Sequence, residues 1–132
     1  MATIPQHLDW VAKRAACNVA QVFNEICEGV LSDVKVINEV RKLPPEESFQ
    51  ATFASDGFTL VIGRLGCLPR VVTRINACKD QIIVSHQPAS ETDWCAEVGL
   101  NNEGRCILRR DGTELEQWQF RKEALESLFF GK

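Results

Sequence analysis

The first part of the chain carries apolar residues at helical spacing. They recur every three or four positions, at Leu8, Val11, Ala15, Val19, Val22 and Ile26, and so form one apolar face on an amphipathic helix. Thr3 and Gln6 make a capping-box pattern at its start, and Gly29 suits the position after a last turn. The pattern predicts a long helix from Thr3 to just before Gly29 that packs on a broad apolar surface.

Residues 34–43 fit two patterns. Val34, Val36 and Val40 share the two-residue periodicity of a strand, but two of these valines also fit a helical repeat with Leu43. A helix unbroken from Thr3 to Leu43 would be roughly 60 Å long at 1.5 Å per residue, which is too long for a domain of this size. We therefore favour a strand and keep the helix as the alternative.

From residue 49 onward, short alternating runs are separated by turn signals. Asp56-Gly57 is a type I′ signal, and a two-residue loop there pairs Phe53 with Leu60 and Ala51 with Ile62. A loop at Lys79-Asp80 sets Ile75 opposite Val84 and Thr73 opposite His86. Each register places apolar residues on one face of the sheet.

Two further turns continue this sheet. Asn102-Glu103-Gly104 places Leu100 opposite Cys106, after the alternating run 94–100. Asp111-Gly112 is a second type I′ signal, which sets Leu108 opposite Leu115 and Arg109 opposite Glu114. A leucine pair inside and an opposite-charge pair outside suit a half-buried antiparallel sheet.

A last apolar stripe over residues 120–130 predicts a C-terminal helix. The 132 residues are enough for one domain. We therefore predict a single α+β domain over residues 1–132, in which an antiparallel β-meander of five to seven strands packs against a long N-terminal helix and a C-terminal helix. An open sheet and a partial barrel both remain compatible with the pattern.

Composition narrows the function. The formal net charge of −3 argues against a general nucleic-acid binder, which needs basic surface for phosphates. No apolar run approaches the roughly 18 residues of a membrane span. His7, Asp9 and Lys13 interrupt the place of a signal peptide's apolar core. We therefore expect a cytoplasmic protein that does not bind membranes.

The six cysteines include no C-x-x-C pair. Six cysteines in a short secreted chain would suggest three disulfides, but without a secretory signal we expect reduced thiols that serve mainly as small buried hydrophobes. Their spacings match no zinc signature, and strand parity sends Cys95 and Cys106 to opposite faces. We expect neither a metal nor a cofactor.

Catalytic signals are few. Only His7 and His86 could act as a base for a nucleophile. His86 ends a core-facing row, where a histidine more often closes off a core than performs chemistry. No phosphate-binding loop occurs. We lean against an enzyme and leave the question open.

The predicted outer face of the sheet mixes apolar residues with arginines. Its predicted interaction residues are Val61, Arg74, Ile83, Arg105, Ile107 and Arg109. Arginine is enriched at protein interfaces, although scattered apolar residues on a sheet surface are also normal. We hypothesise a non-catalytic protein-binding module that uses this face or the flank of a helix, with another protein or a second copy of the chain as partner.

The alternative is a small-molecule-binding protein or an enzyme with a pocket between the N-terminal helix and a curved sheet. Trp94, Trp10 and Phe53 would line this pocket, and His86 would be the polar group at its mouth. Apolar walls with few polar groups are usual for ligand pockets. A solidly filled core would count against this hypothesis.

In size, acidity and element order the chain is similar to type III secretion chaperones. This resemblance implies a protein-binding, chaperone-like role. Those chaperones also place a helix in the middle of the sheet, for which this sequence shows no pattern.

Overall fold

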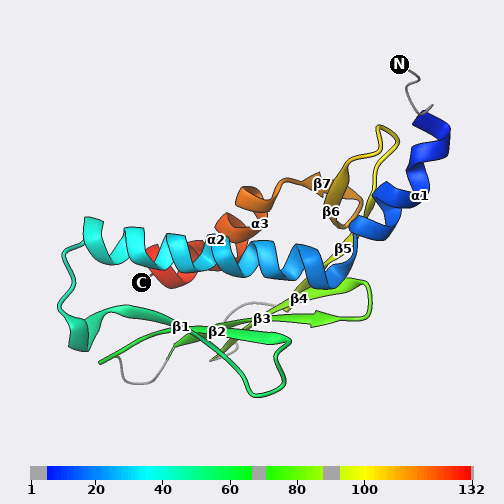
Figure 1. The fold of residues 1–132 in the computed structure, drawn as a ribbon. Coiled ribbons are helices and arrows are strands. Elements are labelled where there is room, and N and C mark those ends of the chain that lie inside the picture. Colours follow the sequence, from blue (N-terminus) through cyan, green and yellow to red (C-terminus); the bar gives the residue numbers. More distant parts are fainter. Residues whose placement is uncertain (1–5, 67–70, 88–92, 132) are drawn as a thin grey trace.

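The computed structural model describes residues 6–66, 71–87 and 93–131, and Figure 1 shows them in two layers. One layer is an antiparallel sheet of seven strands, which follow their order in the sequence. The strands are β1 (Phe49–Phe53), β2 (Thr59–Arg64), β3 (Val72–Cys78), β4 (Gln81–Gln87), β5 (Trp94–Leu100), β6 (Cys106–Arg110) and β7 (Thr113–Leu115). As described, β1 and β7 are free edges, so the sheet is open.

The helices form the second layer. α2 (Val19–Val40) and α3 (Gln117–Phe130) lie against one face of the sheet, whereas α1 (Gln6–Ala16) lies apart from them, beside the β5–β6 turn (Figure 1). A short 3₁₀ helix, η1 (Pro45–Glu47), precedes β1. The predicted α+β fold with a helix at each end is confirmed, and in the described residues no helix interrupts the sheet, unlike in type III secretion chaperones.

Four hairpins have the register that their turn signals predicted. Apolar residues face the helices in each of them, because strand side chains alternate between the two faces. The confirmed pairs include Phe53 with Leu60, Thr73 with His86, Ile75 with Val84, Leu100 with Cys106, Leu108 with Leu115, and Arg109 with Glu114.

The turn of the first hairpin differs from the prediction. Gly57 has a φ of 76°, but Asp56 is not among the residues with positive φ, and a type I′ turn needs positive φ at both central positions. Asp56 instead accepts hydrogen bonds from the Phe58 amide at 2.7 Å and from Thr59 Oγ1 at 3.0 Å. Bonds to its side chain therefore stabilise this turn, and the register of the strands is unchanged.

The predicted N-terminal helix is broken in two. Asn18 separates α1 from α2 because its side chain accepts a hydrogen bond from the Gln21 amide at 2.8 Å, as the N-cap of a new helix. Thr3, on which the predicted capping box rests, lies outside the described residues. The break removes the length argument against a helix beyond Gly29.

Residues 34–40 continue α2, so the predicted strand is wrong, and Gly29 lies inside the helix rather than after it. Val34 and Ile37 are buried on the same face of α2 as Val30. Both periodicities were present in the sequence, and packing of this face against the sheet favours the helical one.

The core lies between α2, α3 and the sheet. Ile26 and Val30 of α2 have no exposed surface, and neither do Leu60, Ile75 and Ile82 of the sheet. Full burial of one such side chain contributes roughly 1.5–3 kcal/mol to stability. These buried residues therefore hold α2 against the sheet.

Asn38 clamps the end of α2 to the first strand. Its Nδ2 donates to the Phe49 carbonyl at 3.0 Å, and the Phe49 amide donates to its Oδ1 at 2.9 Å. The Phe49 ring is buried and packs edge-on against Phe129 of α3, with centroids 4.9 Å apart. Phe49 thus fixes α2, β1 and α3 relative to one another.

A disulfide joins Cys17 to Cys106, with Cα atoms 5.3 Å apart. The prediction that all the cysteines are reduced is therefore wrong for this pair. Cys17 lies at the break between α1 and α2, and Cys106 begins β6, so the bond fastens the helices to the sheet. Their separation of 89 residues explains why sequence spacing gave no sign of it.

Loss of this disulfide should destabilise the protein. A closed loop of this length contributes roughly 4.6 kcal/mol in the chain-entropy model, so we expect Cys17→Ser/Cys106→Ser to lower the free energy of unfolding by up to about that amount. Urea denaturation measures the loss, and Cys78→Ser, at an exposed free thiol, is the control. A non-reduced digest that lacks a Cys17–Cys106 peptide pair would contradict the assignment.

Candidate functional site

α2 and α3 lie side by side and are joined by three polar contacts, about two turns apart along α2 and one to two turns apart along α3. They are Gln117 Nε2 to Glu25 Oε1 at 2.6 Å, Arg121 Nε to Asp33 Oδ2 at 2.8 Å, and Arg41 Nη1 to the Phe129 carbonyl at 2.8 Å. Residue numbers increase along both helices from one contact to the next, so the helices run parallel.

Gly29 allows the central contact to form. A Cβ at this position would lie 2.7 Å from Arg121 Cζ and 2.8 Å from its Cδ, closer than carbon atoms pack. Arg121 therefore crosses α2 over the glycine to reach Asp33, and both side chains are largely buried there, with 22% and 34% of their surface exposed. Glycine inside a helix costs roughly 1 kcal/mol relative to alanine, and this contact gives it a structural reason.

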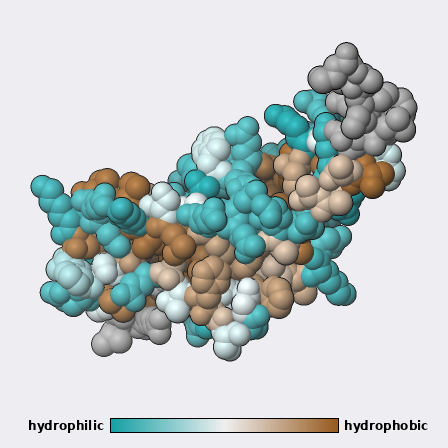
Figure 2. Space-filling view, in the orientation of Figure 1, coloured by the Kyte–Doolittle hydropathy of each residue, from teal (hydrophilic) through white to brown (hydrophobic). Residues whose placement is uncertain are grey.

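An apolar groove of about 410 Å³ runs between the two helices. Its floor is formed by the buried residues Ile37, Leu125 and Phe129. Its edges carry large apolar side chains with much of their surface exposed: Val36 (53%), Val40 (72%), Trp118 (54%) and Phe130 (70%). We call this surface the α2–α3 groove. Figure 2 shows apolar residues at the end of the molecule where both helices end.

The two exposed aromatic rings are held in position. Trp118 Nε1 donates to Glu116 Oε2 at 2.7 Å, and Glu116 is the N-cap of α3. The Phe130 ring packs edge-on against Phe129, with centroids 6.4 Å apart. Binding therefore needs little further ordering of either ring, which lowers its entropic cost.

Charged residues border the groove as two ion pairs. Arg121 binds Asp33, and Lys122 Nζ lies 3.5 Å from Glu126 Oε2 one turn along α3. The Lys122 and Glu126 side chains are 62% and 58% exposed. An apolar centre with a polar border is typical of protein-binding surfaces.

This groove was not predicted from the sequence. Val36 and Val40 were assigned to a strand, and Trp118 preceded the predicted C-terminal helix, which in fact begins at Gln117. The Val36–Val40 spacing and the Trp118–Lys122–Glu126–Phe130 row, each at four-residue intervals, were signals that could have indicated two helix faces.

The predicted interaction residues of the sheet lie on several strands. The three apolar residues among them are not neighbours. Val61 (β2) is opposite Arg74 (β3), Ile83 (β4) is opposite Cys95 (β5), and Ile107 (β6) is opposite Gly99 (β5). A strand lies between each pair of these apolar residues, and all three are only partly exposed. Arg109 forms an ion pair with Glu114 at 3.7 Å, and Arg105 lies 3.8 Å from Glu103.

The predicted pocket residues occupy separate places. Trp10 lines a hollow at the β5–β6 turn, whereas Phe53 lines another at β1 and β2. His86 Nδ1 lies 3.1 Å from Thr73 Oγ1, as the strand register predicted. Trp94 packs against Phe120 at 5.2 Å between ring centroids and is covered by Arg110, whose Cζ lies 4.0 Å from its centroid. Trp94 thus joins the sheet to α3.

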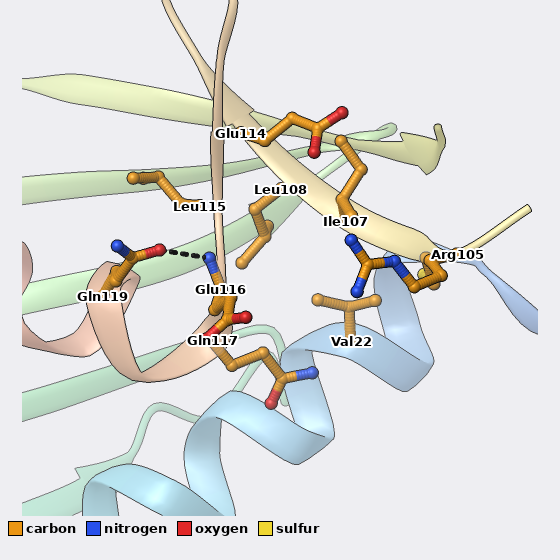
Figure 3. A pocket seen from close by; sticks show the side chains of 10 residues that line it. Val22, Arg105, Ile107, Leu108, Glu114, Leu115, Glu116, Gln117 and Gln119 are labelled. Atoms are coloured by element: carbon orange, nitrogen blue, oxygen red, sulfur yellow. Dashed lines mark hydrogen bonds between the residues drawn. The ribbon is translucent and has the colours of Figure 1, made fainter. Parts of the chain in front are cut away.

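Another hollow, of about 480 Å³, lies between the start of α2, β6 and the start of α3 (Figure 3). Val22, Leu108 and Leu115 form its apolar part, and Arg105 and Glu114 contribute opposite charges. The four predicted pocket residues do not line it. In the described part of the chain, no group of three His, Cys, Asp or Glu residues could hold a metal ion.

Neither the helices nor comparison with known proteins adds a functional assignment. Among the described residues, no helix has the length and apolar character needed to cross a membrane. Comparison with known protein families, curated proteins and solved structures finds no significant match. The surfaces of this chain therefore have to indicate its function.

Substitution of Gly29 should reveal its role beside Arg121. We expect Gly29→Ala to bring no stability gain, because the new Cβ displaces Arg121 from Asp33. In an Arg121→Ala background the same change should stabilise by about 1 kcal/mol, the ordinary helix-propensity gain. Urea denaturation of the four proteins measures this double-mutant cycle. Equal effects of Gly29→Ala in both backgrounds would contradict the proposed contact.

The free thiols should differ sharply in reactivity. Burial raises the pKa of Cys27 to about 11, so at pH 8 almost none of this thiol is in the reactive thiolate form. Cys78 is exposed. Iodoacetamide at pH 8 should therefore label Cys78 in the native protein and leave Cys27 unmodified until urea is added, as peptide mass spectrometry can show. Equal native labelling would contradict the burial of Cys27.

Proposed function

We propose that this chain is a non-catalytic protein-binding module and that it binds through the α2–α3 groove. The observation that carries this proposal is the group of four large apolar side chains at the edges of one groove, all more than half exposed. Soluble monomers rarely leave such a contiguous patch uncovered. The outer face of the sheet supports binding less well, because its apolar residues are separated and partly covered.

The residue types on the groove also favour protein binding. Tryptophan is strongly enriched among residues that dominate binding energy, especially where an apolar surface surrounds it. Trp118 is already oriented by Glu116, and the floor beneath the groove is continuous with the core through Phe129. A rigid aromatic anchor on a well-packed base is suited to a helix or another apolar protein surface.

The disulfide bears on where the protein acts. Disulfides persist in oxidising compartments and are rare in the cytosol. The Cys17–Cys106 bond therefore favours an oxidising compartment over the cytoplasmic location expected from the sequence. Intact-mass analysis of protein alkylated at the moment of cell lysis distinguishes the two locations. Cys17 takes up the alkylating group only if it is unpaired, as expected in the cytoplasm.

Site-specific photo-crosslinking in the cells that produce the protein tests the groove. A photoreactive residue at Val36, on the groove, should yield a discrete cross-linked protein, whereas the same residue at exposed Arg74, on the outer sheet face, should not. Trp118→Glu should reduce the Val36 product about tenfold or more, because a charge is buried and the anchor is lost. Absence of a product from Val36, or equal products from both positions, would overturn the proposal.

A further inference from the structure

We propose that the α2–α3 groove binds a second copy of this chain, with the two α3 helices packed antiparallel about a two-fold axis that passes midway between Lys122 and Glu126. This inference rests on the proposed function and names the partner that the groove binds. The order of the residues along α3 carries it.

The exposed row on α3 is symmetric about the midpoint between Lys122 and Glu126. Trp118, Lys122, Glu126 and Phe130 all line the groove and follow one another at four-residue spacing. In this order they are aromatic, basic, acidic and aromatic. Antiparallel pairing about the midpoint places Trp118 of one copy against Phe130 of the other, and Lys122 of one copy against Glu126 of the other.

Helix geometry is compatible with this contact. Residues four apart form the ridges through which helices most commonly pack, with axes crossing at about 50°. The row extends about 18 Å along the axis at 1.5 Å per residue. Val40 borders the Phe130 end of the groove, since the adjacent Arg41 binds the Phe129 carbonyl. Trp118 of one copy therefore meets an apolar surface formed by Val40 and Phe130 of the other.

The charges favour the antiparallel arrangement over the parallel one. Lys122 and Glu126 pair within one chain, yet more than half of each side chain stays exposed and available. In an antiparallel dimer, four charges alternate in sign across the axis. A parallel dimer would instead set Lys122 against Lys122 and Glu126 against Glu126, and like charges at an interface oppose association. A groove for an unrelated helix needs no such symmetry.

The available area indicates a dimer of modest affinity. At their exposures of 54% and 70%, Trp118 and Phe130 together present on the order of 250 Å², so two copies supply about 500 Å² of aromatic surface. The valines and the charged border add to this, which brings the interface to the lower end of specific complexes, about 1,200 Å² in total. We therefore expect a dissociation constant in the micromolar range.

Sedimentation velocity of the full chain, from about 1 to 200 µM, tests the inference over the affinity range expected for so small an interface. The wild type should dimerise. Lys122→Glu and Glu126→Lys should each weaken the dimer at least tenfold, because each places like charges across the axis. The double variant Lys122→Glu/Glu126→Lys should associate within about threefold of wild type, since the exchange restores opposite charges. Arg74→Glu, on the outer sheet face, is the matched control and should change nothing.

A mixture of the two single variants gives the sharpest readout. The Lys122→Glu chain then carries two acidic residues in the row, and the Glu126→Lys chain carries two basic ones. Heterodimers should therefore make up more than the half of all dimers that random pairing gives. Native mass spectrometry with one of the two chains ¹⁵N-labelled measures this fraction. Circular dichroism verifies that each variant is folded. A wild type that stays monomeric, or a purely statistical mixture, would overturn the inference. If the chain does not dimerise but Val36 cross-links to a different protein, the groove is still a protein-binding surface and only the dimer is refuted. If Val36 cross-links to no protein, the proposed protein-binding function is refuted as well.

Discussion

Packing of α2 across one face of the sheet sets the positions of most other elements. Ile26 and Val30 meet Leu60, Ile75 and Ile82 in a layer without exposed surface, and this contact buries much of the apolar face of the longest helix. The sheet has apolar side chains on this face along all its strands, so α2 alone cannot cover it. α3 covers the rest, and Phe120 and Trp94 join it to the sheet.

The groove arises from the way these two helices share the sheet. Each helix packs its most apolar face against the sheet. Three polar contacts join the neighbouring flanks of the two helices in their parallel arrangement. Arg121 occupies the space that an apolar side chain would otherwise fill, since Gly29 leaves room for it. The valines and aromatic residues beside the groove therefore keep more than half of their surface exposed, which makes this surface suitable for binding.

The disulfide acts on the opposite end of the molecule. Cys17 lies where α1 separates from α2, and Cys106 lies at the start of β6. The bond therefore holds the N-terminal end of the helical layer to the β5–β6 hairpin, and Asn38 and Phe49 hold its C-terminal end to β1. With α2 secured at both ends, the groove is presented on a rigid base, and an interface of small area depends on such rigidity.

The sequence by itself determined the sheet. Alternation of apolar and polar residues has a fixed period of two, and local turns such as Lys79-Asp80 and Asp111-Gly112 set the register, so pairs such as Ile75–Val84 and Leu108–Leu115 could be predicted. Only the tertiary structure decided the state of residues 34–40, the Cys17–Cys106 bond and the α2–α3 groove. Residues 34–40 fit two periods until burial of Val34 and Ile37 on the sheet favoured one. The disulfide and the groove each join residues about 90 positions apart, and no local pattern records which distant residues the folded chain brings together.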